Sequence, residues 1–190
     1  MARPKSADKR NALLSAAVEV FAEQGLASPA LKIAKAAGVA EGTLFNYFAT
    51  KDELLNELYL DLKSELRDVM MPGYPRNETL KKRLRHVWQA YVEWGVAEPQ
   101  KRKVMTLLNL SGQVTEQSKL AGMQDFVEVN ALMQESMALG LLRQQPPAFL
   151  SAIMGALAET AMDFISREPG QADQYAEAGF EALWNAIARE

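Results

Sequence analysis

The fold is decided by residues 28–51, which read SPALKIAKAAGVAEGTLFNYFATK. Gly38 ends a first short helix, because the tight turn that follows needs the positive φ that glycine adopts freely. Leu44 and Phe48 are four residues apart and therefore form the buried side of a second helix. The stretch predicts two short helices joined by a sharp turn.

Ser28 and Pro29 are expected to begin the first of these helices. A serine oxygen can accept a hydrogen bond from the free amides of a first turn, and proline at the first helical position has no amide to leave unpaired. We therefore expect Ser28 as the cap and Pro29 as the first helical residue, with Ser28 also near any bound DNA.

The second helix has a polar side opposite Leu44 and Phe48. Short polar groups let a helix enter the major groove of DNA, and Asn46 is the best base reader because its amide can pair with adenine through two hydrogen bonds. Gly42 would permit close approach, while Tyr47 and Lys51 lie at the rim and should contact phosphates. The DNA-binding residues that the sequence predicts are Ser28, Glu41, Gly42, Thr43, Asn46, Tyr47 and Lys51.

The segment IAKAAGVAEGTLFNYFATKDEL resembles the helix-turn-helix signature of the TetR family of transcriptional repressors. The matching positions are Gly38, Thr43, Leu44, Phe45, Tyr47, Phe48 and Lys51. The sequence departs from the pattern in two places. Pro29, Ala30 and Leu31 replace the usual Thr or Ser followed by Val-Arg, and Phe45 replaces a tyrosine whose hydroxyl would contact a phosphate.

Length and composition favour an intracellular protein with two domains. The chain has 190 residues, of which 48% are hydrophobic, and no cysteine. The absence of cysteine excludes disulfides, thiolate zinc sites and a cysteine nucleophile. We expect no apolar run long enough to span a bilayer, and the basic N-terminus lacks a signal-peptide core, so the expected protein is soluble and cytoplasmic.

The net charge of −3 is unevenly distributed. Residues 1–51 carry seven Lys or Arg and four Asp or Glu, a net +3, whereas residues 52–190 carry 14 and 20, a net −6. Arg3, Lys5, Lys9 and Arg10 could form a mobile basic arm that approaches phosphates; the alternative is an ordinary charged terminus.

Apolar residues recur at intervals of three and four along the whole chain, so we predict an all-α fold. Stop signals divide it into nine helices, the number that the TetR family has. The predicted domains are a DNA-binding head, 1–51, and a ligand-binding and dimerisation domain, 52–190. The helix that begins at Lys51 with a capping box of Thr50 and Glu53 should link them.

The last two helices are the expected dimer surface. Large apolar groups near the end of the chain leave a monomer little to cover them, and TetR proteins pair these two helices across a two-fold axis. A dimer also places two heads about one turn of DNA apart, where they read a palindrome. The predicted interface residues are Phe164, Phe180, Leu183 and Trp184, with burial inside one protomer as the alternative.

The middle helices are rich in aromatic residues and methionine. Core packing is the default interpretation, but such side chains also line sites for flat, apolar or cationic molecules. In TetR proteins this region holds the inducer site, so we predict a ligand site there, in which Lys63 could contact an acidic group. Its candidate residues are Tyr59, Lys63, Leu66, Trp88, Tyr91, Met105, Met133, Met137 and Met154.

Nothing in the sequence predicts catalysis, a cofactor or a metal. His86 is the only histidine, and it and the basic run at 81–85 are typical of a solvated helix surface. An enzyme would need a titratable cluster, and His86, Glu159 and Asp163 do not form one by spacing. The remaining alternatives are a helical protein-interaction module without a small-molecule response and, further behind, a small-molecule enzyme.

Further segments, most of them outside the predicted DNA-binding head, resemble one branch of the TetR family. The segment MARPKS, the WG at 94–95 followed by Pro99, LAETAMDF at 157–164 and YAEAGFEALW at 175–184 look like the RamR-type branch of TetR regulators. That resemblance implies a homodimeric repressor that binds a palindromic operator. It also implies release by an aromatic, cationic or amphipathic molecule, and control of multidrug efflux genes.

Overall fold

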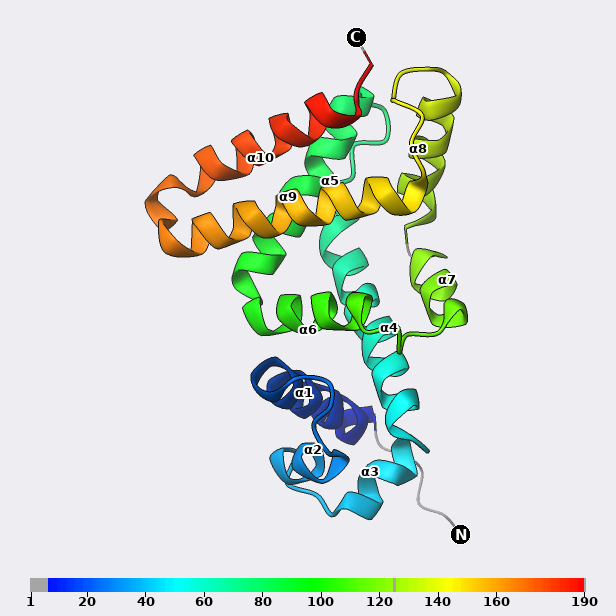
Figure 1. Ribbon diagram of the computed structural model, residues 1–190, viewed down its shortest axis with the longest axis vertical. Coiled ribbons are helices and arrows are strands. Elements are labelled where there is room, and N and C mark those ends of the chain that lie inside the picture. Colours follow the sequence, from blue (N-terminus) through cyan, green and yellow to red (C-terminus); the bar gives the residue numbers. More distant parts are fainter. Residues whose placement is uncertain (1–6, 125, 190) are drawn as a thin grey trace. The chain divides into compact units, whose positions relative to one another are not determined.

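A computed structural model describes residues 7–124 and 126–189, without the side chains of 147 and 148, and within them the fold is all-α, as predicted. The only extended pairing among these residues is one bridge between Leu142 and Ala188. The helices are α1 (Ala7–Gln24), α2 (Ala30–Ala36), α3 (Glu41–Tyr47), α4 (Lys51–Met70), α5 (Leu80–Ala97), α6 (Pro99–Leu110), α7 (Glu116–Gln124), α8 (Val127–Ala138), α9 (Pro147–Arg167), the 3-10 turn η1 (Pro169–Gln171) and α10 (Ala172–Ile187) (Figure 1).

The expected number of nine helices is therefore wrong by one in the described chain. The additional helix arises because the region before the stop signal at Gly140 forms two helices, α7 and α8; residue 125 between them lies outside the described residues. The Phe126 amide donates to the Met123 carbonyl at 3.0 Å, a turn-type bond that interrupts the helical ladder. Gly95 does not act as a stop signal, because it lies buried within α5.

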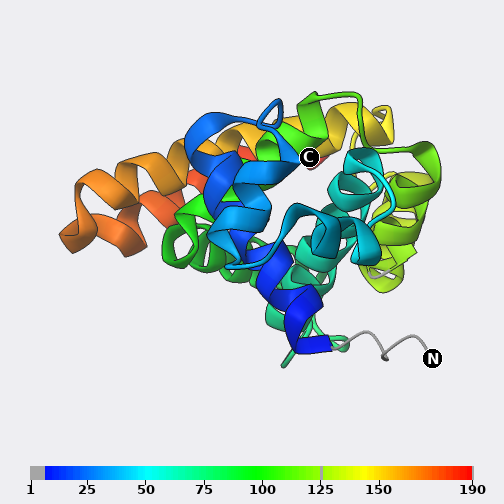
Figure 2. The same cartoon turned by 90° about the horizontal axis from the view of Figure 1, so that it is seen from below.

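The chain forms two compact units, and their boundary differs from the predicted one at residue 51. Unit 1 comprises residues 1–64 and 99–122, and unit 2 comprises residues 65–98 and 123–190. In unit 1, α1 packs against α2 and α6, and α2 packs against α3; Figure 2 shows α1 in dark blue beside α2. The helix-turn-helix therefore shares a core with a later segment of the chain.

Asn56 on α4 fixes the start of α7 within unit 1. Its side-chain amide donates to the carbonyls of Asp52 and Gln113, at 2.8 and 3.3 Å. Its side-chain oxygen accepts from both the amide and the hydroxyl of Thr115, at 2.9 and 3.1 Å. Further along, a Cβ added at Gly122 would lie 3.0 Å from the Tyr59 ring, so α7 lies close against α4.

Unit 2 is built on α5, α9 and α10, which pack together around Trp88. Trp88 is fully buried, and its indole N–H donates to the Ala176 carbonyl at 2.9 Å. A Cβ added at Gly179 would lie only 2.7 Å from the Trp88 ring and 3.2 Å from the Ala161 Cβ. The tight approach of α10 thus depends on a glycine at this position. Figure 1 shows α9 and α10 running side by side from the η1 turn.

We had expected the basic run at 81–85 to be a solvated helix surface. In the structure, two of its side chains form ion pairs with another helix. Arg85 binds Glu177 and Glu181, and the Lys81 ammonium lies 2.8 Å from Glu181. The Lys81 hydrogen bond, with help from Arg85, holds the pKa of the Glu181 carboxyl below its ordinary value. These ion pairs join α5 to α10.

His86 also has a structural partner. Its Nε2 lies 3.0 Å from the Met70 carbonyl at the end of α4, and its ring meets the buried ring of Tyr74 edge-on at 5.9 Å. The Arg83 side chain donates to the Tyr74 hydroxyl at 3.2 Å. These contacts, all within unit 2, fix the loop between α4 and α5.

Helix α9 contains a longer apolar run than we had expected from the sequence. Its segment Phe149–Arg167 is long and apolar enough to cross a membrane by length and composition, and 22% of this stretch is buried. One such helix is weak evidence for a membrane protein, because a helix that packs against other protein passes the same test.

Candidate nucleic-acid interface

The turn between α2 and α3 has the geometry that the sequence predicted. Gly38 has a φ of +67°, its amide donates to the Lys35 carbonyl at 3.1 Å, and the Val39 amide donates to the Ala34 carbonyl at 2.9 Å. This pair of bonds is a Schellman motif, which satisfies the last carbonyls of α2. Glycine is required here because the left-handed conformation is strained for other residues.

The two sides of α3 are distinct, as expected. Leu44 and Phe48 are 0% and 1% exposed, so they anchor the helix on the core of unit 1. Glu41, Gly42 and Asn46 are exposed, while Thr43 and Tyr47 are half-buried. The exposed groups of α3 thus include an amide, a carboxylate and a bare glycine backbone.

The start of α2 differs from the prediction. Helix α2 begins at Ala30, its cap is Pro29, and no side chain bonds to the free amides there. Ser28 is buried at 5% exposure rather than placed as a cap, and its amide donates to the Gly25 carbonyl at 3.2 Å. The side chain of proline has no oxygen to act as a cap, and the Lys32 amide donates instead to the Pro29 carbonyl at 3.0 Å.

The predicted capping box at the start of α4 is present, with a shift of one residue. The Glu53 amide donates to Thr50 Oγ1 at 3.0 Å, and the Glu53 carboxylate accepts from the amide of Ala49 at 2.6 Å. Lys51, the first residue of α4, is half-buried, and its ammonium lies 6.0 Å from the ring centre of Phe21. The cap thus fixes the position of Lys51, four residues after the end of α3.

Arg10 does not belong to a mobile arm. It lies in α1, and its guanidinium binds Glu57 on α4 at 2.6 Å. Lys9 is exposed on the same helix, while Arg3 and Lys5 lie outside the described residues. Of the four residues proposed for the arm, Arg10 is therefore a fixed contact within unit 1.

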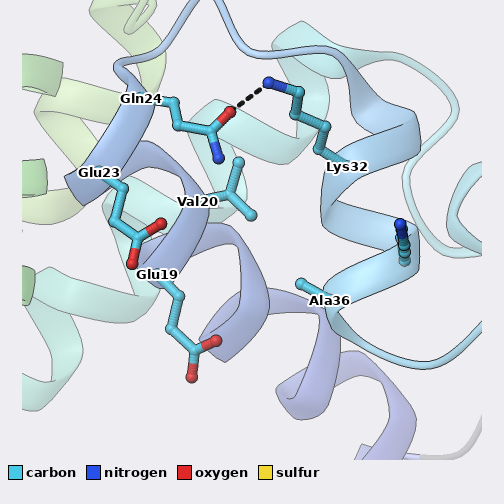
Figure 3. Close-up of a pocket in the computed structure, with 7 residues that line it drawn as sticks. Glu19, Val20, Glu23, Gln24, Lys32 and Ala36 are labelled. Atoms are coloured by element: carbon cyan, nitrogen blue, oxygen red, sulfur yellow. Dashed lines mark hydrogen bonds between the residues drawn. The ribbon is translucent and has the colours of Figure 1, made fainter.

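A shallow hollow of about 480 Å³ lies between α1 and α2, a feature that the sequence did not predict. Figure 3 shows Glu19 and Glu23 on its α1 wall and Lys32 on its α2 wall, where Lys32 bonds to the side chain of Gln24. Because carboxylates face ammonium groups across it, the hollow has little net attraction for phosphate.

The predicted ligand-site residues fall in both units. In unit 1, Tyr59 and Met105 are buried, burial raises the pKa of the Tyr59 phenol, and the Lys63 ammonium lies 5.6 Å from the Tyr59 ring centre. In unit 2, Leu66 is also buried. One core in unit 2 brings together Trp88, Tyr91, Met133, Met137 and Met154. The hollow at α1 and α2 and a second one at residues 169–174 are lined by none of these residues.

The predicted dimer residues are not equally accessible. Phe180 and Leu183 are core residues of unit 2, at 1% and 4% exposure, whereas Phe164 is 42% exposed and Trp184 is half-buried. Two rows of exposed, mostly small residues, each spaced by four, run along the neighbouring helices. They are Ala152, Ala156, Thr160 and Phe164 on α9, and Gln174, Ala178, Ala182 and Ala186 on α10.

Residues 13–58 match the profile of the family described as bacterial regulatory proteins, tetR family. The chain is 38% identical over 73 residues to the fatty acid metabolism regulator protein of Bacillus subtilis, a match that covers 38% of either protein. It is 29% identical over 113 residues to the transcriptional regulator AcrR of Shigella flexneri, covering 56% of this chain and 50% of AcrR. The matched stretches thus span half or less of these relatives.

Solved structures extend the likeness over nearly the whole chain. A TetR family transcription regulator from Shewanella sp. PV-4 superposes with a TM-score of 0.84 at 28% identity, covering 96% of this chain and 99% of the other. LfrR of Mycobacterium smegmatis, solved with proflavine, shares the fold with a TM-score of 0.63 at 18% identity. The chain thus resembles TetR family transcription regulators both in the profile of its helix-turn-helix and in the fold around it.

Proposed function

We propose that this protein is a homodimeric repressor that binds a palindromic operator and is released by a small amphipathic or aromatic molecule. The observation that carries the proposal is the exposure on α3 of Asn46 and Gly42, which share one side of the helix, and of Glu41, while Leu44 and Phe48 anchor the helix. A short rigid helix with this surface fits the major groove. Ser28, Thr43, Tyr47 and Lys51 remain proposed contacts around it.

Roles within this surface follow from chemistry. Asn46 reads adenine, because its amide offers a donor and an acceptor at the spacing of the adenine edge. Lys51 contacts a phosphate, since it sits at the capped start of α4, where its position is fixed. Contacts to phosphates set the register on the duplex, and Asn46 contributes sequence preference.

Dimerisation through α9 and α10 is supported by the residues of these helices that remain exposed in a single chain. The α9 row is exposed on a helix whose apolar stretch is only 22% buried in a single chain. Small residues spaced by four let two helices approach closely, and a second copy offers a matching surface by symmetry. Phe164 and Trp184 are the large side chains that retain exposed area for this contact.

The proposed ligand class is amphipathic or aromatic, with multidrug efflux genes as the regulated target. The packing of Trp88, Tyr91, Met133, Met137 and Met154 on one core supports it, because thioethers and rings adapt to varied apolar molecules. Lys63 beside Tyr59 would suit an acidic head group. The efflux target rests on the RamR-type sequence resemblance alone.

Selection of binding sites from a pool of random duplexes tests the DNA-binding proposal. We expect an enriched palindrome with half-site centres about one helical turn apart, and an equilibrium sedimentation mass of two chains per particle. A monomer that enriches no sequence would instead favour the protein-interaction module.

Ligand release is tested by titration of the selected operator complex with two panels, aromatic cations and medium- to long-chain fatty acids. A ligand that binds both DNA-competent and DNA-incompetent forms equally cannot shift their balance, so binding and release must be measured together. If members of both panels bind the protein and none changes operator affinity, the ligand-response proposal fails.

A further inference from the structure

Phe45 is an exposed aromatic residue on the recognition helix. Its side chain is 41% exposed, while Leu44 before it is completely buried. The phenylalanine ring has no atom that can hydrogen-bond to a phosphate. An apolar ring at this place is therefore either incidental or in contact with something apolar on the DNA.

Gly42 provides a second observation. It lies three residues before Phe45 and four before Asn46, so it is the neighbour of both on the helix surface. Its φ is not positive, and a Cβ added to it would meet no atom within 4 Å. Glycine weakens a helix relative to alanine. Neither the backbone nor internal packing needs glycine here, which leaves close approach by an external surface as the reason.

We propose that Phe45 packs on the 5-methyl group of a thymine, beside the base that Asn46 reads. The proposal rests on the proposed DNA binding and adds a second specificity-determining residue to it. Thymine alone presents a methyl group in the major groove, and phenylalanine is one of the side chains that contact it. Because Phe45 and Asn46 flank Gly42, the half-site contains this thymine next to the adenine, on either strand.

Deoxyuridine tests the contact, since it lacks only the methyl group of thymidine. In the selected duplex each thymine is replaced in turn, and the Kd is measured by fluorescence anisotropy for the wild type, Phe45→Ala and Asn46→Ala. We expect about a fourfold loss at one or two positions in the wild type, the effect of one buried methyl group. Phe45→Ala should bind the thymine duplex and the uracil duplex with equal affinity. Asn46→Ala should still bind the uracil duplex more weakly than the thymine duplex, the uracil penalty, but should lose its preference for adenine.

Phe45→Leu is the second variant, because it keeps an apolar contact and should keep part of the penalty. Thermal unfolding of each variant checks that the head remains folded. A uracil penalty that is absent in the wild type, or equal in the wild type and Phe45→Ala, overturns this inference while DNA binding stands. If the selection enriches no sequence, the proposed function fails and this inference fails with it.

Discussion

The guanidinium of Arg10 lies 2.6 Å from the carboxylate of Glu57, which is 47 residues later in the chain. Asp61, one turn further along α4, is 3.6 Å from the same guanidinium. The pair joins the first helix of unit 1 to α4. Arg10 thus stabilises unit 1 through ion pairs with the carboxylates of Glu57 and Asp61.

Arg10→Ala should lower the free energy of unfolding by roughly 0.2–1 kcal/mol, because both side chains are more than a third exposed and solvent weakens the pair. It should leave the salt dependence of DNA binding unchanged. Chemical denaturation and salt titration measure the two effects. Glu57→Gln is the matched control, and the double variant should lose little more than either single one. A salt slope reduced by about one in Arg10→Ala would mean that Arg10 contacts a phosphate.

Lys51→Ala should show the reverse of Arg10→Ala: weaker DNA binding with little change in stability. With one phosphate contact fewer, the variant releases one counterion fewer when it binds DNA. Affinity should therefore fall for all sequences, and the slope of log K against log salt should drop in magnitude by about one. The capping pair of Thr50 and Glu53 stays in place, so stability should change little. Affinity at several salt concentrations, on selected and unrelated duplexes, makes the measurement. A loss confined to one base position would contradict the phosphate role.

Asn46→Ala should cost ~1–3 kcal/mol at a single base position, since a bidentate amide–adenine pair is lost. Its exposure means that the fold should tolerate the change. Binding to duplexes with each base substituted in turn shows where discrimination disappears. Uniform weakening across all duplexes would move Asn46 from base reading to backbone contact.

Gly179→Ala should destabilise unit 2 by roughly 1–3 kcal/mol, because the new methyl group would overlap the Trp88 ring at 2.7 Å. Both helices that it would separate, α5 and α10, are held by a buried core. Gly170→Ala is the control, since a Cβ there meets no atom within 4 Å, and it should change stability by less than about 0.5 kcal/mol. Equal melting temperatures for the two variants would show that α10 can shift without loss.

Stability should fall in acid through Glu181. Its folded pKa is lowered, chiefly by the Lys81 hydrogen bond, so its contribution is present above the unfolded pKa near 4.5 and is lost as the pH falls through the folded pKa. The melting temperature of the wild type should therefore drop below about pH 4.5, and Glu181→Gln should show a shallower drop. Lys81→Met should act similarly, as it removes the partner. Parallel curves for all three proteins would contradict this role.

The sequence by itself determined the features that depend on near neighbours. Gly38 ends α2, Leu44 and Phe48 bury α3, and Thr50 with Glu53 starts α4, all as predicted. Each involves groups within about four residues, where the backbone ladder and side-chain spacing allow few alternatives. The all-α fold follows from the same periodicity.

Contacts between distant residues were decided only by the tertiary structure. Arg10 meets Glu57, and Asn56 meets Thr115, across 47 and 59 residues, and no local pattern chooses such partners. Phe180 is as apolar as Phe164, yet packing places one in the core and leaves the other exposed. Helical periodicity tells which residues share a side of a helix, but which side meets the core depends on the helices packed around it.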